Sequence, residues 1–187
     1  MPAALDADTR ERLRAGVRAR IRDVPDFPKP GILFRDITPV LADAETLAGA
    51  LDLHIDRIAD LVGHVDTVVG IESRGFLFGM AVAARIGAGF VVVRKPGKLP
   101  AKVVEATYEL EYGTDRLQIH ADAIRPGERV IIVDDLLARG GTGGAARDLV
   151  GKLGGDVVAA LFLIELGFLG GRKRLGALRV EAVLGYD

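Results

Sequence analysis

The sequence predicts an α/β fold in which helices flank a mostly parallel central sheet. Short runs rich in β-branched residues, among them VDTVVGIES and GFVVVRK, alternate with segments of helical spacing that end in glycine. This alternation is typical of β-α-β units, whose strands run parallel. Two further runs, RVIIVDD and DVVAALFLIEL, lack the polar alternation of a half-exposed strand and indicate strands buried on both faces.

The length and composition favour a single domain over residues 1–187. Domains usually contain about 100 to 200 residues, and 49% hydrophobic residues are enough to line one core. With 25 basic and 26 acidic residues the net charge is -1, which excludes a general basic field for nucleic acid. The absence of cysteine excludes disulfides and thiolate metal sites. The start of the chain lacks signal-peptide features and no apolar run is long enough to span a bilayer, so we expect a cytoplasmic protein with no membrane partner.

The amino-terminal third is predicted to be helical at both ends. Apolar residues lie about one turn apart from Asp8 to Val24, which predicts an amphipathic helix with Asp8 and Glu11 spaced like a capping pair. The next stretch, PDFPKPGILFRDITP, contains four prolines and a glycine and predicts extended or turning chain. A second helix is expected from Asp43 to about Leu61.

The remaining segments complete the predicted sheet. GFLFGMAVAARIG and TGGAARDLVGKLGG are expected helices with glycine stops, and RVEAVLGYD is an expected last strand. TYELEYGTDRLQIH alternates in polarity around a Gly-Thr-Asp turn. This segment predicts an antiparallel hairpin beside the parallel strands.

A glycine-rich turn after a buried strand is the strongest functional feature. In VIIVDDLLARGGTGGAARDL the strand is expected to end in Asp134 and Asp135, and Gly140, Gly141 and Thr142 follow at a helix start. Ligands of open α/β sheets bind at this edge, and a helix amino terminus with exposed N–H groups favours a phosphate. The two acids would repel a bare polyanion but accept hydrogen bonds from sugar hydroxyls. A ribose 5-phosphate satisfies both conditions.

Three other interpretations of this turn are less favoured. A P-loop requires lysine after the glycines, and none is present. GTGGAA matches the dinucleotide-binding pattern, with Glu165 at a suitable distance, but DDLLARG separates those glycines from the strand. The third is a turn without function that carries two solvated acids.

VIIVDDLLARGGT closely resembles the phosphoribosyl-pyrophosphate signature of the type I phosphoribosyltransferases. The resemblance implies a 5-phosphate loop made of Ala138, Arg139, Gly140, Gly141 and Thr142. It also implies that Asp134 and Asp135 hold the ribose hydroxyls. Arg139 departs from the family pattern, which usually has threonine there. If that position acts through its backbone N–H, arginine retains binding and is either solvated or an extra cation for the phosphate.

Further segments are similar to the adenine branch of this family. FPKPGILFRDITPVL resembles the part that forms a hood over the base, which implies a division into residues 1–36 and a core of residues 37–187. Phe34 would then stack on the purine, and Leu33 and Arg35 would read its edge through backbone groups.

The leaving-group side is implied by two segments. GIESRGFLFG resembles the family's pyrophosphate loop, with Ser73 and Arg74 facing the leaving group and a non-proline cis peptide expected between Glu72 and Ser73. The basic segment from residue 94 onwards resembles a flexible lid of about residues 94–110. Its expected pyrophosphate-side cations are Arg94, Lys95 and Lys98. Lys102 has no assigned role and is interpreted as a solvated charge.

YELEYG resembles the family's YSLEYG, which implies that Glu111 is the catalytic carboxylate and that Tyr112 lies beside it in the lid. Alternation alone does not separate Glu111 from Glu109, because residues two apart share one face of a strand. The choice therefore rests on the resemblance, with Glu109 as the expected surface residue.

The resemblance implies that adenine is joined to the ribose 5-phosphate of phosphoribosyl pyrophosphate (PRPP) with release of pyrophosphate. Mg²⁺ would arrive with the diphosphate rather than on protein ligands, and the enzyme would be a homodimer. A PRPP-binding regulator without turnover and a transferase for another purine are open alternatives. A dinucleotide-dependent reductase is the most distant alternative.

Overall fold

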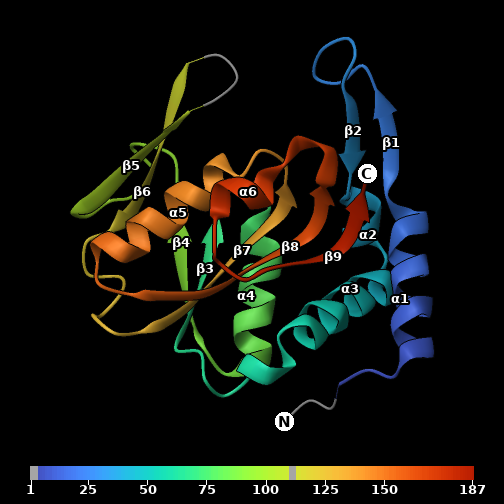
Figure 1. Cartoon of the computed structure of the whole chain (residues 1–187), viewed down its shortest axis with the longest axis horizontal. Helices are drawn as coiled ribbons and strands as arrows, with labels where there is room; N and C mark the ends of the chain where they lie inside the picture. The colour runs from blue at the N-terminus through green and yellow to red at the C-terminus, as the bar shows by residue number, and fades with distance from the viewer. Residues whose placement is uncertain (1–3, 110–112) are drawn as a thin grey trace. The chain divides into compact units, whose positions relative to one another are not determined.

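The structure, a computed structural model, describes residues 4–109 and 113–187 (Figure 1). It separates into two compact units, one that ends at Ala59 and one that runs from Asp60 to Asp187. The helices are α1 (Ala7–Arg20), α2 (Thr38–Ala42), α3 (Ala44–Arg57), α4 (Gly75–Ile86), α5 (Gly141–Lys152) and α6 (Gly171–Leu175), with the 3-10 turns η1 (Ala59–Leu61) and η2 (Gly167–Leu169). The strands are β1 (Arg22–Pro25), β2 (Leu33–Asp36), β3 (Thr67–Ile71), β4 (Gly89–Val93), β5 (Val103–Glu109), β6 (Thr114–His120), β7 (Arg129–Leu137), β8 (Asp156–Leu166) and β9 (Val180–Tyr186).

The larger unit is built on a five-stranded parallel sheet with the order β4-β3-β7-β8-β9. Every neighbouring pair in it is parallel, which confirms the predicted α/β class. The runs RVIIVDD and DVVAALFLIEL form the neighbouring strands β7 and β8 in the interior of the sheet. Because parallel strands covered on both faces need no polar alternation, these runs are apolar almost throughout.

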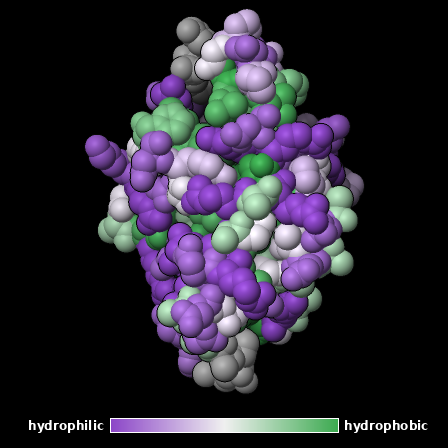
Figure 2. Space-filling view, turned by 90° about the vertical axis from the view of Figure 1, so that its right-hand side faces the viewer, coloured by the Kyte–Doolittle hydropathy of each residue, from purple (hydrophilic) through white to green (hydrophobic). Residues whose placement is uncertain are grey.

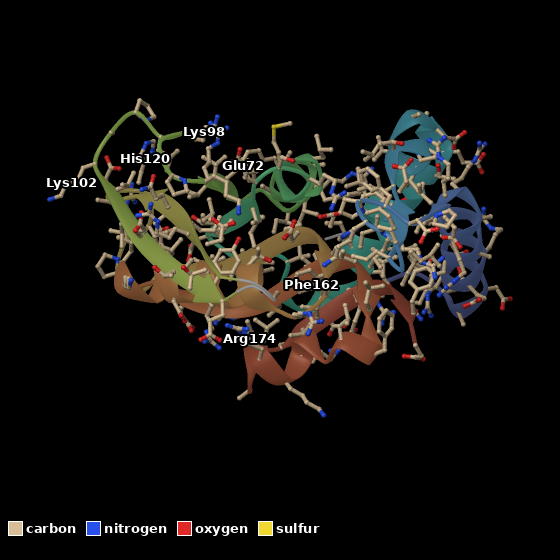
Figure 3. All side chains as sticks on the ribbon, turned by 90° about the horizontal axis from the view of Figure 1, so that it is seen from above. Glu72, Lys98, Lys102, His120, Phe162 and Arg174 are labelled. Carbon is tan, nitrogen blue, oxygen red and sulfur yellow. The ribbon has the colours of Figure 1, made fainter. Side chains whose placement is uncertain are left out.

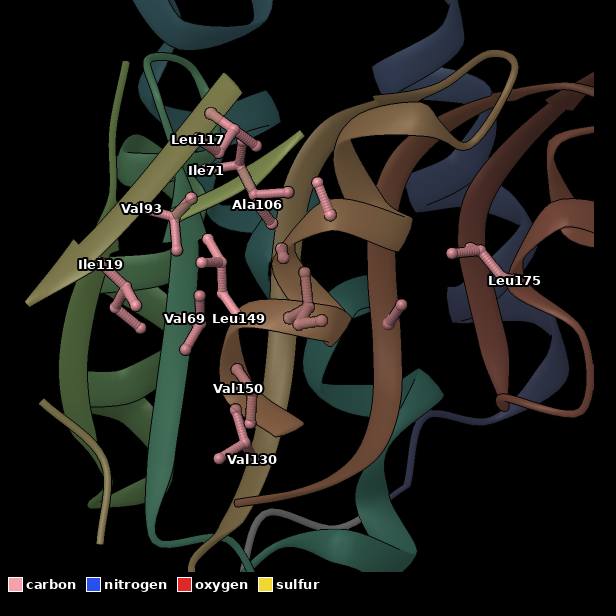
Figure 4. Close-up of a cluster of buried hydrophobic side chains, with 14 of the residues drawn as sticks. Val69, Ile71, Val93, Ala106, Leu117, Ile119, Val130, Leu149, Val150 and Leu175 are labelled. Atoms are coloured by element: carbon pink, nitrogen blue, oxygen red, sulfur yellow. The ribbon is translucent and has the colours of Figure 1, made fainter. Parts of the chain in front are cut away.

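Helices and a hairpin cover the two faces of this sheet. Gly79 of α4 lies against Val133 of β7, so α4 packs on one face. Ile132 of β7, on the alternate face, belongs to a buried cluster with Leu149 of α5. In Figure 4, Leu117 of the hairpin lies in the same cluster. One part of the core therefore lies between the sheet, α5 and the β5–β6 hairpin, and another lies under α4, where Phe78 and Val133 are fully buried.

The predicted hairpin is confirmed, but its limits differ from those expected. β5 pairs with β6 in antiparallel register from Val103 opposite His120 to Glu109 opposite Thr114. Thr114 and Asp115, expected in the turn, are strand residues, and Asp115 lies opposite Tyr108. The predicted lid of residues 94–110 is likewise partly regular, since β5 covers Val103–Glu109 of it. The apolar residues of one hairpin face pack on the core, and this burial fixes the strand.

The carboxyl-terminal segments extend the prediction in two places. β7 continues past the two aspartates to Leu137, because pairing with β8 extends to Glu165. The segment from Gly167 to Leu175 forms η2 and α6, for which the sequence offered no periodic pattern. The expected last strand is β9, which pairs with β8 at the edge of the sheet.

The smaller unit begins with α1, which is shorter than predicted. It ends at Arg20 because Ile21 is extended and the next four residues form β1. Pro25 disfavours a helical conformation in the residue before it, which explains why Val24 is not helical. The cap is Asp6 rather than Asp8, since the Asp6 carboxylate accepts the N–H of Thr9 at 2.8 Å.

The proline-rich stretch is partly regular structure. β1 and β2 form a short antiparallel hairpin, and the unpredicted helix α2 follows with a proline in its first turn. α3 is capped by Asp43, which accepts the N–H of Thr46 at 2.9 Å, and ends at Arg57 instead of about Leu61. In the space-filling view of Figure 2, hydrophilic residues predominate on the face that is shown and hydrophobic ones gather toward its upper end.

Candidate active site

A cavity of 330 Å³ lies at the carboxyl edge of the parallel sheet, within the larger unit. Its walls come from the segments that follow β3 and β7, where the ligand sites of open α/β sheets are found. The lining residues are Glu72, Ser73, Arg74, Asp134, Asp135, Leu136, Ala138 and Thr142. Six of these were predicted site residues, and the fold brings them together from the turn after β3 and from the end of β7 with the start of α5.

The first wall is the segment that follows β3. The peptide between Glu72 and Ser73 is cis, as predicted. α4 starts directly afterwards, and Gly75 makes its close approach to β7 possible. A Cβ atom on Gly75 would lie 2.6 Å from the carbonyl oxygen of Val133, a distance that real Cβ atoms do not reach. Glycine therefore allows this loop to lie directly against the strand that carries the two acids.

Asp134 and Asp135 are both buried, with 8% and 6% of their surface exposed. The Nε of Arg74 lies 2.8 Å from Oδ2 of Asp135, and the backbone N–H of Asp135 donates to Oδ1 of Asp134 at 2.9 Å. Burial, and then the charge of Asp135, raises the pKa of Asp134 well above its ordinary value. Burial also raises the pKa of Asp135, against the lowering effect of Arg74. The cavity thus holds desolvated carboxyl groups, which are strong acceptors for hydroxyl groups.

The second wall is the loop that joins β7 to α5. Gly140 adopts a left-handed conformation with φ 76° and caps the amino terminus of α5. A Cβ there would lie 2.6 Å from the carbonyl oxygen of Gly171, so both conformation and space require glycine. The first N–H groups of a helix have no acceptor within the helix. Ala138 and Thr142, which lie on either side of this cap in the sequence, line the cavity.

Arg139, Gly140 and Gly141 are not among the cavity-lining residues, although they belong to the same loop. The side chain of Arg139 is exposed. Gly141 lies against the hairpin, since a Cβ on it would be 3.0 Å from Cδ2 of Tyr108. These residues can therefore contribute through backbone groups more readily than through side chains.

The predicted cations of residues 94–98 do not line the cavity but are connected to it through Glu72. The guanidinium of Arg94 donates to Oε1 of Glu72 at 3.3 Å and to the carbonyl of Lys98 at 3.1 Å. The backbone N–H of Lys95 donates to Oε2 of Glu72 at 2.8 Å. Lys98 is exposed close to Glu72, and Lys102 lies farther along the chain at the end of the hairpin (Figure 3).

Sequence reasoning missed three residues of this region. Glu72 lines the cavity and binds the basic segment, while Tyr108 and Asp115 bind the side chain of Lys95. A correct hairpin register would have identified the last two, because it places Asp115 opposite Tyr108 on the inward face.

The residues predicted for the base lie in β2 of the smaller unit. The ring of Phe34 makes an edge contact with Phe27, with centroids 5.1 Å apart at 75°. Arg35 forms an ion pair with Asp23, and Leu33 is 46% exposed.

The predicted catalytic Glu111 and its neighbour Tyr112 lie outside the described residues. Glu109, the expected surface residue, has a side chain that is 80% exposed and lies 3.9 Å from Arg174.

Two features of the described residues concern metal ions and membranes. Residues 4–109 and 113–187 contain no group of three or more His, Cys, Asp or Glu residues arranged to hold a metal ion. In the same ranges, no helix has the length and apolar character needed to cross a bilayer.

Glu165, the acid of the dinucleotide interpretation, binds Arg172 through two contacts of 2.7 Å. These contacts occupy the carboxylate that would bind a ribose.

Known proteins resemble the chain over most of its length. Residues 38–180 match the family model described as the phosphoribosyl transferase domain. An adenine phosphoribosyltransferase of Sorangium cellulosum (strain So ce56) is 57% identical over 171 residues, covering 91% of this chain and 84% of the relative. One of Anaeromyxobacter sp. (strain Fw109-5) is 55% identical over 170 residues, covering 91% and 95%.

Solved structures show the same similarity. The adenine phosphoribosyltransferase of Rhodothermus marinus DSM 4252 is 48% identical with a TM-score of 0.89, covering 94% of this chain and 99% of that one. The Saccharomyces cerevisiae enzyme, solved with an imino-altritol bisphosphate and adenine, is 39% identical with a TM-score of 0.89, covering 93% and 99%. The chain therefore belongs to the phosphoribosyltransferase domain family and, within it, to the adenine phosphoribosyltransferases.

Proposed function

We propose that this chain transfers the 5-phosphoribosyl group of PRPP to adenine, forming AMP and pyrophosphate in purine salvage. The supporting observation is the pairing of a glycine-capped helix amino terminus with two buried acids in one cavity. A phosphate linked to a sugar fits these two kinds of group together. The yeast relative, solved with a bisphosphate and adenine, supports the same substrate class.

The 5-phosphate is assigned to the loop of Ala138, Arg139, Gly140, Gly141 and Thr142. Backbone N–H groups at the start of α5 would donate to the phosphate, aided by the helix dipole and the Thr142 hydroxyl. Asp134 and Asp135 would accept hydrogen bonds from the two ribose hydroxyls. Each hydrogen bond to a charged group contributes about 1.5 to 3 kcal/mol, so a few of them hold the donor firmly.

The leaving group is assigned to the opposite wall. As the N9 atom of adenine bonds to C1 of the ribose, the bond from C1 to the diphosphate oxygen breaks, and negative charge develops on pyrophosphate. Preorganised cations stabilise that charge more than water does. The residues proposed to supply donors and cations are Ser73, Arg74, Arg94, Lys95 and Lys98.

Mg²⁺ is the proposed cofactor, and the donor set fits an ion that is carried by the substrate. Mg²⁺ usually keeps several waters and binds one or two carboxylates together with substrate phosphates. Asp134 and Asp135 can accept hydrogen bonds from such waters without forming a closed metal site. When bound, the ion would neutralise charge on the diphosphate.

The base is assigned to Leu33, Phe34 and Arg35, in the segment 1–36 that we propose to serve adenine, with residues 37–187 as the transferase core. Glu111 is the proposed acid-base group that exchanges a proton or hydrogen bond with the base as N9 loses its proton. Tyr112 and the β5–β6 hairpin would exclude water that otherwise hydrolyses PRPP.

A pyrophosphate-release assay with magnesium and adenine, hypoxanthine or guanine tests this function. We expect turnover with adenine and a loss of about 100-fold or more in kcat for Glu111→Gln, since acid-base groups contribute about 10² to 10⁴. Turnover only with another purine would favour that base. PRPP binding without turnover on any purine would favour the regulator.

Family membership also supports a homodimer and a cytoplasmic location as proposals. Sedimentation velocity tests the first of these. A single species with the mass of one chain, at the concentration used for the assay, would contradict the dimer.

A further inference from the structure

Asp115 and Tyr108 have no role in the reaction proposed above, yet both bind the side chain of Lys95. Nζ of Lys95 donates to the Tyr108 hydroxyl at 2.9 Å and forms an ion pair with Oδ2 of Asp115. The Tyr108 hydroxyl donates to the same carboxylate oxygen at 3.0 Å. Tyr108 and Asp115 are cross-strand partners in the hairpin, so the strand register places both beside the ammonium.

This cluster is connected to both walls of the cavity. On one side, the backbone N–H of Lys95 donates to Glu72, which lines the cavity. On the other side, the ring of Tyr108 lies against Gly141, next to the cavity-lining Thr142. The Lys95 side chain therefore crosses from the segment proposed for pyrophosphate to the hairpin that packs on the 5-phosphate loop.

The geometry leaves the ammonium able to bind an anion. A lysine ammonium has three N–H donors, and Asp115 and Tyr108 accept from it. The Lys95 side chain is 40% exposed, so solvent or a ligand can reach it. Burial opposes the charge, but the hydrogen bonds from Lys95 to Asp115 and Tyr108 outweigh it and raise the pKa of the ammonium. Lys95 thus stays charged and is held in one place.

Order in this side chain has an energetic consequence. A free lysine side chain loses rotamer entropy when it is fixed. Where the fold already fixes the side chain, a ligand that binds it does not bear that cost.

We propose that Asp115, assisted by Tyr108, is a positioning residue that holds the Lys95 ammonium in place for the diphosphate of PRPP. This inference rests on the proposed function. It assigns to Asp115 an effect on PRPP binding that is transmitted through Lys95, without contact between Asp115 and the substrate.

The test is steady-state pyrophosphate release with saturating adenine and magnesium and varied PRPP. Asp115→Asn should raise the KM for PRPP by about ten- to a hundredfold, the range of one charge-assisted hydrogen bond, and leave kcat within about twofold. Asp115→Glu should restore part of the loss, because it keeps the carboxylate. Tyr108→Phe should raise KM by about two- to fivefold, a smaller effect because Asp115 still binds the ammonium.

The chain offers a matched control on the same hairpin. Glu105 lies on the opposite face and accepts from Arg116 at 3.0 Å and Gln118 at 2.9 Å. Glu105→Gln also removes one carboxylate charge from a hairpin ion pair, and it should leave the KM for PRPP unchanged. Equal effects of Glu105→Gln and Asp115→Asn would overturn the inference, since a general weakening of the hairpin would then be sufficient.

A double-mutant cycle tests the route through Lys95. Lys95→Met should raise the KM for PRPP, and Asp115→Asn should change it by less than about twofold in that background, because coupled residues are not additive. Independent effects would overturn the inference. A KM for PRPP equal to that of the unmodified chain in Asp115→Asn would also overturn the inference. If Asp115→Asn does not fold, the same result in Tyr108→Phe would overturn it. Absence of turnover in the unmodified chain overturns the proposed function and this inference together. Turnover in the unmodified chain, with the same KM for PRPP in the variants, overturns the inference alone.

Discussion

The cavity walls and the β5–β6 hairpin are held in place by different interactions. The walls depend on backbone geometry, with Gly75 against β7 and Gly140 against Gly171 at distances that admit no side chain. The hairpin packs on the core through one face, and Lys95 binds its polar partners on that face. Changes to these two glycines should therefore lower activity strongly, while changes around the hairpin should shift substrate affinity by smaller factors.

The largest effect is expected at Gly140. Gly140→Ala places a Cβ at the carbonyl of Gly171 in a left-handed residue, and displacement of the 5-phosphate loop by about 1 Å is enough to cost roughly 100-fold in kcat/KM. Gly144→Ala is the matched control, because a Cβ there meets nothing within 4 Å. It should retain activity and gain about 0.5 to 1 kcal/mol of unfolding free energy in denaturant titrations. Equal activity of the two variants would contradict the account.

Asp134 should show opposite effects on activity and stability. Its pKa is raised by burial and by Asp135, so between the ordinary and the raised value the folded chain binds more protons than the unfolded chain. Stability must then fall as pH rises through that window. Asp134→Asn should lower kcat/KM by about 10- to 100-fold, because it weakens the hydrogen bond to the ribose. It should add about 0.5 to 2 kcal/mol of unfolding free energy at neutral pH and make the stability depend less on pH. Urea titrations at several pH values measure this, and a destabilised variant at neutral pH would contradict it.

The basic segment should show a smaller effect that depends on position. Lys98→Met should raise the KM for PRPP by about three- to fivefold at low salt, and by less at high salt, because exposed charges are screened. Lys102→Met removes the same charge from the end of the hairpin and should leave KM unchanged. Equal effects would mean that total charge matters rather than the position of Lys98.

Arg139 should show the smallest effect. Its side chain is exposed and does not line the cavity, so its contribution to the 5-phosphate loop comes through the backbone, which arginine and threonine share. Arg139→Thr should change the KM for PRPP by about twofold or less, the usual range for surface substitutions. A large gain in affinity would show that the threonine hydroxyl matters.

The cavity walls and the β5–β6 hairpin also differ in how accurately the sequence predicted them. Buried strands and glycine-rich turns carry local signals, so β7, β8 and the loop up to Thr142 could be located from apolar runs and spacing alone. The polar contacts of Lys95, Tyr108 and Asp115 could not, because they depend on a strand register that local alternation did not fix. η2 and α6, whose Gly171 packs on the phosphate loop, were not predicted because the segment has no periodic apolar pattern.

A crystal structure of the chain with PRPP and Mg²⁺ tests the central claim most directly. The account predicts the 5-phosphate on the backbone N–H groups of residues 138–142, with both ribose hydroxyls on Asp134 and Asp135. PRPP bound at a different place, with the cavity between β3 and β7 unoccupied, would contradict it.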